Sequence, residues 1–113
     1  MKIYMTENRI KRAAKRLRKI LRERGLETHY MDCLNLVARL LGFHNYTDFS
    51  RHAVDAPISP FDENLPDADF AARDDFQMGV LAAAGYAAIA REVLDRVNPT
   101  GSWASISAEE IEG

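Results

Sequence analysis

The sequence predicts an all-α fold, a small bundle of about four helices, and three observations support this prediction. Apolar residues recur every three or four positions over several segments, which is the spacing of one face of a helix. Helix-capping residues and glycines stand at the ends of these segments. The alternation of apolar and polar residues that marks a half-buried strand does not extend over a useful length. With 113 residues, of which 47% are hydrophobic, the chain is expected to form one helical domain, residues 1–113.

The first expected helix covers residues 6–25 and has the clearest pattern. Thr6 is a good N-cap residue, and Glu7 lies favourably in the first turn. Gly25 is placed to end the helix in a left-handed conformation. A single apolar stripe is formed by Ile10, Ala13, Ala14, Leu17, Ile20 and Leu21. The remaining face of this helix is almost entirely Lys and Arg.

Residues 28–53 are expected to form two helices that meet at a corner similar to a helix-turn-helix. Thr28 is predicted to cap the first of them. Gly42 is predicted to end it, with Phe43 folding back onto its last turn. The expected apolar face consists of Met31, Leu34, Val37, Ala38 and Leu41.

The second helix of this corner is short and runs to about residue 53. It is expected to begin at Asn45 or Thr47, with Tyr46 and Phe49 facing inward. Asp48 lies near its start, where DNA phosphates would repel a carboxylate. A generic αα-corner is therefore favoured over a DNA-reading unit.

The second half of the chain is expected to contain a loop and one long helix. Residues 56–67 hold three of the four prolines and are predicted to be the loop. The helix is expected over residues 68–97, with Gly79 and Gly85 as positions where it can break or bend. Its expected buried side is Phe70, Phe76, Val80, Leu81, Ala84, Ala88, Val93, Leu94 and Val97. A tail of residues 98–113 follows, in which Ser107 and Glu110 form a capping-box pattern.

The net charge of −2 conceals a strong separation of charge along the chain. Residues 1–26 contain ten basic side chains and two acidic ones, a net charge of +8. Residues 52–113 contain three arginines and twelve acidic side chains, a net charge of −9. Such a separation suggests either a partner selected by charge or a pairing of the two halves with each other.

The basic face of the first helix is the leading candidate for a functional site. Such a face can lie along a phosphate backbone, where each neutralised phosphate releases counterions and adds affinity without reading sequence. The candidate nucleic-acid-binding residues are Lys11, Arg12, Lys15, Arg16, Arg18, Lys19 and Arg22. Two other interpretations are a solvated face neutralised by the acidic half and a contact with an acidic surface of a partner protein. The leading hypothesis is a non-enzymatic helical regulatory protein that contacts nucleic acid.

The alternative hypothesis is a protein–protein interaction module, such as an adaptor or an inhibitor from a mobile element. It would use the acidic loop, or the small residues Gly79, Ala83 and Ala87 of the long helix, which also make a homodimer possible. The acidic residues around the loop are Asp62, Glu63, Asp67, Asp69, Asp74 and Asp75. Their spacing lacks the acidic alternation and the turn glycine of a calcium loop.

No catalytic, metal-binding or cofactor-binding set is predicted. His29 and Cys33 are four residues apart on one helix, but a zinc site needs three or four protein ligands. A buried Cys33 is the simpler interpretation, because a free cysteine behaves as a small hydrophobic residue. Neither a glycine-rich phosphate loop nor a nucleophile elbow is present in the sequence. The sequence therefore predicts that the protein is not an enzyme.

A cytoplasmic location without membrane contact is expected. The chain contains no run of about 18 to 20 apolar residues, the length that spans a bilayer. Its N-terminus lacks the apolar region of a signal peptide. A single cysteine, Cys33, suits a reducing compartment.

Two segments together resemble a small helical domain of alphaproteobacterial proteins that are labelled glyoxalase-related. They are residues 17–25 (LRKILRERG) and residues 34–43 (LNLVARLLGF), with Tyr46 and Phe49 after them. The resemblance covers about residues 10–53 and implies a helical fold and a bacterial cytoplasmic setting. It implies no glyoxalase activity, because this sequence has neither the strands nor the His and Glu metal ligands of those enzymes.

Overall fold

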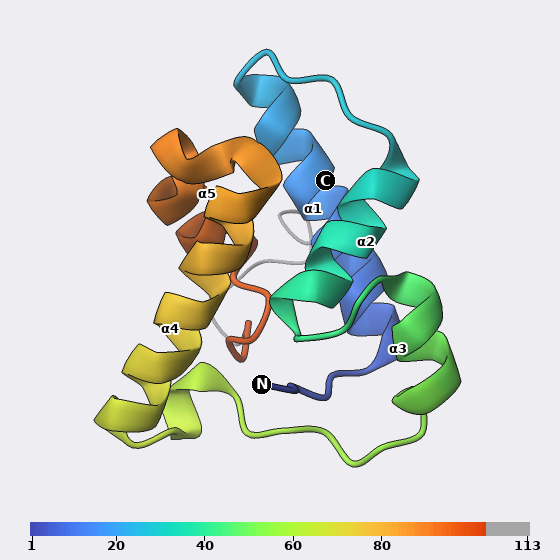
Figure 1. Ribbon diagram of the computed structural model, residues 1–113, viewed down its shortest axis with the longest axis vertical. Helices are drawn as coiled ribbons and strands as arrows, with labels where there is room; N and C mark the ends of the chain where they lie inside the picture. The colour runs from blue at the N-terminus through green and yellow to red at the C-terminus, as the bar shows by residue number, and fades with distance from the viewer. Residues whose placement is uncertain (104–113) are drawn as a thin grey trace.

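The computed structural model describes residues 1–103, and this part of the chain is entirely helical, with no strand (Figure 1). The all-α prediction is therefore confirmed. In chain order the elements are α1 (Glu7–Glu23), α2 (Tyr30–Leu40), α3 (Tyr46–His52), the short 3-10 helix η1 (Asp62–Asn64), α4 (Asp67–Leu81), the π-helical turn η2 (Ala82–Tyr86), the 3-10 turn η3 (Ala87–Ile89) and α5 (Ala90–Val97). The capping-box pattern of Ser107 and Glu110 lies outside the described residues.

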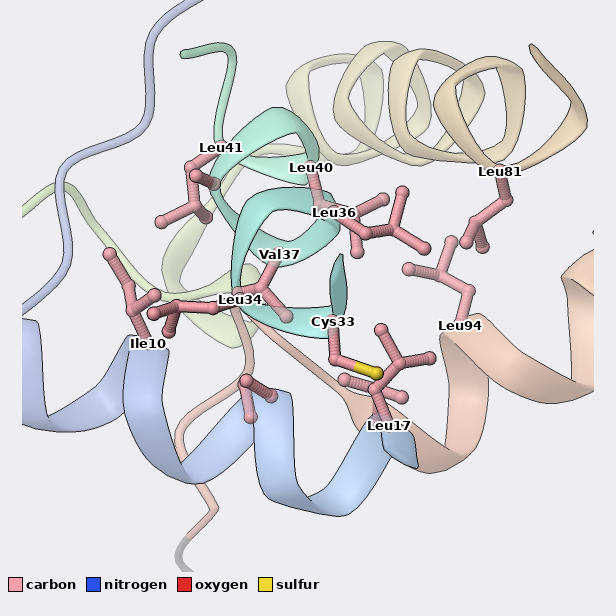
Figure 2. Packing of buried hydrophobic residues seen from close by; sticks show 14 of the residues in the cluster. Ile10, Leu17, Cys33, Leu34, Leu36, Val37, Leu40, Leu41, Leu81 and Leu94 are labelled. Carbon is pink, nitrogen blue, oxygen red and sulfur yellow. The ribbon is translucent and has the colours of Figure 1, made fainter. Parts of the chain in front are cut away.

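Four helices surround the core in a ring. Helix α2 packs against α1 on one side and against α4 on the other, and α5 completes the ring by contacting both α1 and α4. Figure 2 shows Leu17 of α1, Cys33 of α2 and Leu94 of α5 pointing toward one another in the centre. All three side chains are buried. Within residues 1–103 no helix is long and apolar enough to cross a membrane.

The predicted C-terminal ends of α1 and α2 are confirmed in detail. Gly25 and Gly42 both have a positive φ, of 77° and 90°. At each end the amide after the glycine donates back to the last turn: Leu26 to the Leu21 carbonyl at 2.9 Å, and Phe43 to the Ala38 carbonyl at 3.0 Å. This is the Schellman arrangement, which satisfies carbonyl groups that the helix leaves unpaired.

Two details of the predicted corner are wrong. Thr28 does not cap α2, because the N-cap residue is His29 and the Thr28 hydroxyl lies 3.3 Å from the Cys33 sulfur. Met31 is 56% exposed, although the spacing placed it on the buried face. Asn45 begins α3 as predicted, and its side chain accepts from the Asp48 amide at 2.8 Å.

The predicted long helix over residues 68–97 is two helices with a bend between them. Gly85 has a φ of 98°, which interrupts the helical course inside the π-helical turn. The chain then turns back, so that α5 packs on α1 instead of continuing away from it. The expected buried side is also partly wrong: Phe70 is 43% exposed and Ala88 is exposed, while Arg73 and Gln77 are buried.

The proline-containing loop between α3 and α4 is held to the rest of the molecule by a few hydrogen bonds. The Ser59 amide donates to the Tyr4 carbonyl at 2.7 Å, and the Ser59 hydroxyl accepts from the Tyr4 amide at 2.8 Å. Further along, the Asp62 amide donates to the Thr100 carbonyl at 2.9 Å. The loop therefore connects the N-terminal segment with the chain that follows α5.

Candidate nucleic-acid interface

Helix α1 is fixed in the molecule by its apolar side and by both of its ends. The Thr6 hydroxyl accepts a hydrogen bond from the Arg9 amide at 3.1 Å, as a capping residue does. The stripe of Ile10, Ala13, Ala14, Leu17, Ile20 and Leu21 is at most 2% exposed, as predicted. Because this stripe faces the core, the opposite side of α1 must face outward.

Five of the seven predicted binding residues make up that outward side. They are all exposed and are Lys11, Arg12, Lys15, Lys19 and Arg22. At 100° per residue, Lys15 and Lys19 lie opposite the centre of the apolar stripe, and the other three flank them. These five residues are called the outer face of α1 below. From Lys11 to Arg22 the outer face extends about 17 Å along the helix.

The remaining two predicted residues, Arg16 and Arg18, are half-buried and bind backbone carbonyls of neighbouring segments. Nε of Arg18 donates to the Thr28 carbonyl at 3.0 Å, which ties α1 to the segment before α2. Nε of Arg16 donates to the Arg96 carbonyl at the end of α5. These two side chains brace the helix, so the candidate interface is narrower than the sequence predicts.

The outer face keeps most of its positive charge. Lys11 is 3.6 Å from Glu7 and Arg22 is 3.6 Å from Glu27, and all four side chains are at least 41% exposed. Exposed ion pairs of this kind contribute little, about 0 to 1 kcal/mol. Within residues 1–103, Arg12, Lys15 and Lys19 form no salt bridge.

As far as it is described, the acidic half of the chain forms salt bridges with α1 only at the C-terminal end of that helix. Glu92 of α5 pairs with Arg24, and Arg96 of α5 pairs with Glu23 at 2.6 Å. Glu92 also contacts Arg96 at 3.3 Å, so the four groups form one network between the two helices. In the described part of the chain, no carboxylate of residues 52–103 pairs with a residue of the outer face. Within residues 1–103, these salt bridges therefore leave the outer face exposed.

Arg9 is a basic residue of α1 with a structural role that the sequence does not indicate. Its guanidinium lies over the Trp103 ring, 3.6 Å from the centroid, and 5.5 Å from the Phe61 centroid. It also donates to the carbonyls of Asn98 and Gly101. Burial lowers the pKa of Arg9 to about 10, against the raising effect of the nearby acids, Asp62 first. Arg9 thus joins α1 to the loop before α4 and to the segment after α5.

The corner between α2 and α3 does not present a DNA-reading helix. Helix α3 has only seven residues. Its Asp48 carboxylate accepts from the His44 amide at 2.9 Å and lies 3.8 Å from the Lys2 ammonium. The hydrogen bond from His44 is the main cause that lowers the pKa of Asp48. Asp48 therefore stabilises the corner itself, which agrees with the interpretation as an αα-corner.

The other chemical candidates are separate from the outer face. Cys33 is 2% exposed, as predicted, and burial raises the pKa of its thiol. His29 is exposed at the start of α2. Among residues 1–103 there is no group of three His, Cys, Asp or Glu side chains that could hold a metal ion.

Comparisons with known proteins identified no relative of this chain. No protein-family model matches the chain, and the searches of curated proteins and of solved structures found no match. The resemblance of residues 10–53 to the glyoxalase-related helical domain stays a prediction.

Proposed function

We propose that this protein is a non-enzymatic binding protein that contacts the phosphate backbone of nucleic acid through the outer face of α1. One observation carries the proposal: five exposed Lys and Arg side chains form a strip that the acidic half of the chain, as far as it is described, does not neutralise. A duplex carries about one negative charge for every 1.7 Å of its axis, so a strip about 17 Å long faces several phosphates.

The rigid mounting of α1 supports this proposal. The helix is held by its buried stripe, by Arg16 and Arg18, and by the network with α5. Its backbone therefore loses little freedom on binding, and only the ends of the Lys and Arg side chains must be ordered. This lowers the entropic cost of forming contacts.

The contacts proposed here position the protein without reading the base sequence. Lysine ammonium groups bind phosphates as point charges, whereas sequence is read by side chains that enter a groove. The short α3, with Asp48 near its start, does not suit such readout. Binding should therefore depend on salt and hardly on sequence.

A charge-reversal experiment tests the proposal. Binding of a labelled DNA duplex and of a labelled single-stranded RNA is measured at low salt for the wild type and for Lys15→Glu with Lys19→Glu. The matched control is Arg39→Glu with Arg51→Glu, which makes the same change in charge at exposed positions of α2 and α3. We expect the first variant to lose binding and the control to retain most of it. Equal loss in both variants, or no binding by the wild type, would reject the outer face as the interface.

A protein–protein contact through the acidic half is the second candidate function. It is favoured by a cavity of about 520 Å³ that opens among η1, α4 and α5. This cavity lies among the acidic residues that the sequence singles out, and its lining is strongly negative.

A further inference from the structure

The cavity among η1, α4 and α5, called the acidic cavity below, carries a surplus of negative charge. Its carboxylates are Asp62, Glu63, Asp67, Asp74 and Asp95. Arg91 is the one basic residue that lines it, and the buried Arg73 lies behind it in contact with Asp62 at 3.0 Å. Arg9 of α1 also lies near Asp62 and Glu63, and with all three arginines counted the cavity keeps two negative charges more than positive ones.

The carboxylates at the rim are the least engaged. Asp62 is occupied by Arg73 and by the Thr100 hydroxyl, and Asp74 is held by Arg91. By contrast, Asp67 is exposed and forms no salt bridge within residues 1–103. Asp95 is 62% exposed although it contacts Arg91. A positively charged ligand would therefore meet Asp67 and Asp95.

Gln77 gives the acidic cavity an unused hydrogen-bond acceptor. Its side chain is only 3% exposed, and its Nε2 donates to the Leu40 carbonyl at 3.2 Å and to the Thr100 hydroxyl at 3.3 Å. Because the Leu40 carbonyl can only accept, the orientation of the amide is fixed. Its Oε1 accepts no hydrogen bond within residues 1–103, yet it is not sealed from solvent, and Gln77 lines the cavity. An acceptor in the cavity that no protein group uses can receive a hydrogen bond from a ligand that brings N–H groups.

Apolar side chains in the same cavity suit the stem of a long basic residue. Phe70 is 43% exposed and lines the cavity together with Leu65 and Leu94. Lys and Arg lay their aliphatic stems along apolar surface while their charged ends meet polar groups. Carboxylates around an apolar floor with a free acceptor are the chemistry that recognises such a side chain.

We propose that the acidic cavity binds Lys side chains from the outer face of α1 of a second copy of this chain. Lys15 and Lys19 are one turn apart on that face, so they can approach two rim carboxylates at once. Within residues 1–103 of their own chain, neither lysine forms a salt bridge with a carboxylate of the acidic cavity. The exposed lysines of one molecule and the rim carboxylates of another are therefore both available for a contact between molecules.

The contact is heterologous, since the helix of one copy meets the cavity of the next. A few side chains in a cavity of about 520 Å³ bury much less area than a permanent dimer needs, so the association is weak and reversible. Nucleic acid would compete for the same outer face. The self-association itself does not depend on nucleic-acid binding, and either proposal can fail without the other.

The test uses the full chain without nucleic acid and measures mass by sedimentation velocity from micromolar to submillimolar concentrations. The cavity variant carries Asp67→Lys with Asp95→Lys, and the helix variant carries Lys15→Glu with Lys19→Glu. Asp69→Lys with Asp75→Lys is the matched control, because these exposed residues of α4 do not line the cavity. We expect the average mass of the wild type and of the control to rise with concentration at low salt and to return to that of the monomer at high salt. Each of the other two variants should raise the dissociation constant at least about tenfold.

Mixing the two variants gives the decisive result. The cavity variant keeps a normal α1 and the helix variant keeps a normal cavity, so an equimolar mixture should recover the association that neither variant shows alone. This recovery also shows that both variants are folded. A wild type that stays monomeric at every concentration would overturn the proposal. So would a mixture that stays monomeric, or an association that the cavity variant leaves unchanged.

Discussion

Helices α1 and α4 have similar lengths, 17 and 15 residues, but they use their inner sides in different ways. Helix α1 buries six apolar residues and keeps its cations outside. Helix α4 buries only Arg73, Gln77 and Leu81, so two of its three buried side chains are polar. A charged side chain on the exposed side of a helix stays available to a partner. A charged side chain on the buried side is instead paired with groups of the same chain.

The difference has a consequence for each surface. Arg73 points inward and binds the Pro60 carbonyl and Asp62, which fixes η1 beside α4. Asp67, Phe70, Asp74 and Gln77 of α4 line the acidic cavity. The outer face of α1 is thus positive and convex, and the cavity beside α4 is negative and concave.

The largest expected effect is on the core below α1. Leu17→Ala removes a fully buried side chain and should lower the free energy of unfolding by about 3.5 kcal/mol. Phe70→Ala on α4 removes a larger side chain that is 43% exposed, and it should cost less than about 1 kcal/mol. Urea unfolding of both variants measures the difference. If the two losses are equal, the two helices do not differ in the way described.

Arg73→Ala tests whether α4 depends on its buried charge. The substitution leaves Asp62 without its ion pair and the Pro60 carbonyl without its donor, so a loss of about 2.5 kcal/mol is expected. Arg91→Ala is the control, because it removes an arginine of α5 that is 54% exposed, and it should cost less than about 1 kcal/mol. Thermal unfolding of the two variants compares them, and a silent Arg73→Ala would contradict the structural role of this residue.

Substitution of two glycines with positive φ distinguishes the energetic cost of close packing from the cost of backbone strain alone. Gly42 at the end of α2 has the Met1 carbonyl so near that an added Cβ would overlap it, whereas Gly85 after α4 has open space around it. Gly42→Ala should therefore cost about 3 kcal/mol, from strain and from displacement of the N-terminal segment. Gly85→Ala should cost only about 1 to 2 kcal/mol, from strain alone. Similar losses of unfolding free energy would show that the N-terminal segment is not packed against Gly42.

The smallest expected effect is a dependence of stability on pH that arises where α4 meets α5. The hydrogen bonds from Arg91 lower the pKa of Asp74 below its ordinary value. The pair therefore stabilises the fold at pH values above that ordinary value, about 4, and this contribution is lost as the pH falls through the lowered pKa. Arg91→Gln should reduce the loss of stability between about pH 4 and pH 2 by less than about 1 kcal/mol. Parallel unfolding curves for wild type and variant over this range would contradict the assignment.

The sequence predicts α1, α2 and α3 well because their ends and faces follow from local rules. A capping side chain, a glycine with positive φ and an apolar stripe each act within a few residues. The predicted helix over residues 68–97 fails because Gly85 allows a break that only the packing of α5 on α1 stabilises. The burial of Arg73 and Gln77 on α4 could not be predicted from local rules either, because their hydrogen-bond partners lie in distant segments.

The residues of the candidate interface could also be predicted only in part from the sequence. Helical spacing places all seven basic residues away from the apolar stripe, and five of them do form the exposed outer face. Helical spacing cannot show that Arg16 and Arg18 bind backbone carbonyls of neighbouring segments. Counting charges also cannot show that, within residues 1–103, the salt bridges between the two helices are confined to Glu23, Arg24, Glu92 and Arg96.

The dependence of nucleic-acid affinity on salt tests the central claim most directly. If all five residues of the outer face contact phosphates, the logarithm of the affinity for a duplex should fall with the logarithm of the salt concentration with a slope of about −4.5. Between 50 and 200 mM salt, affinity should then fall about 500-fold. Lys15→Ala with Lys19→Ala should make the slope shallower by about 1.8, while Arg39→Ala with Arg51→Ala should leave it unchanged. A wild-type slope near zero, or the same slope in both double variants, would contradict the claim that the outer face of α1 binds nucleic acid.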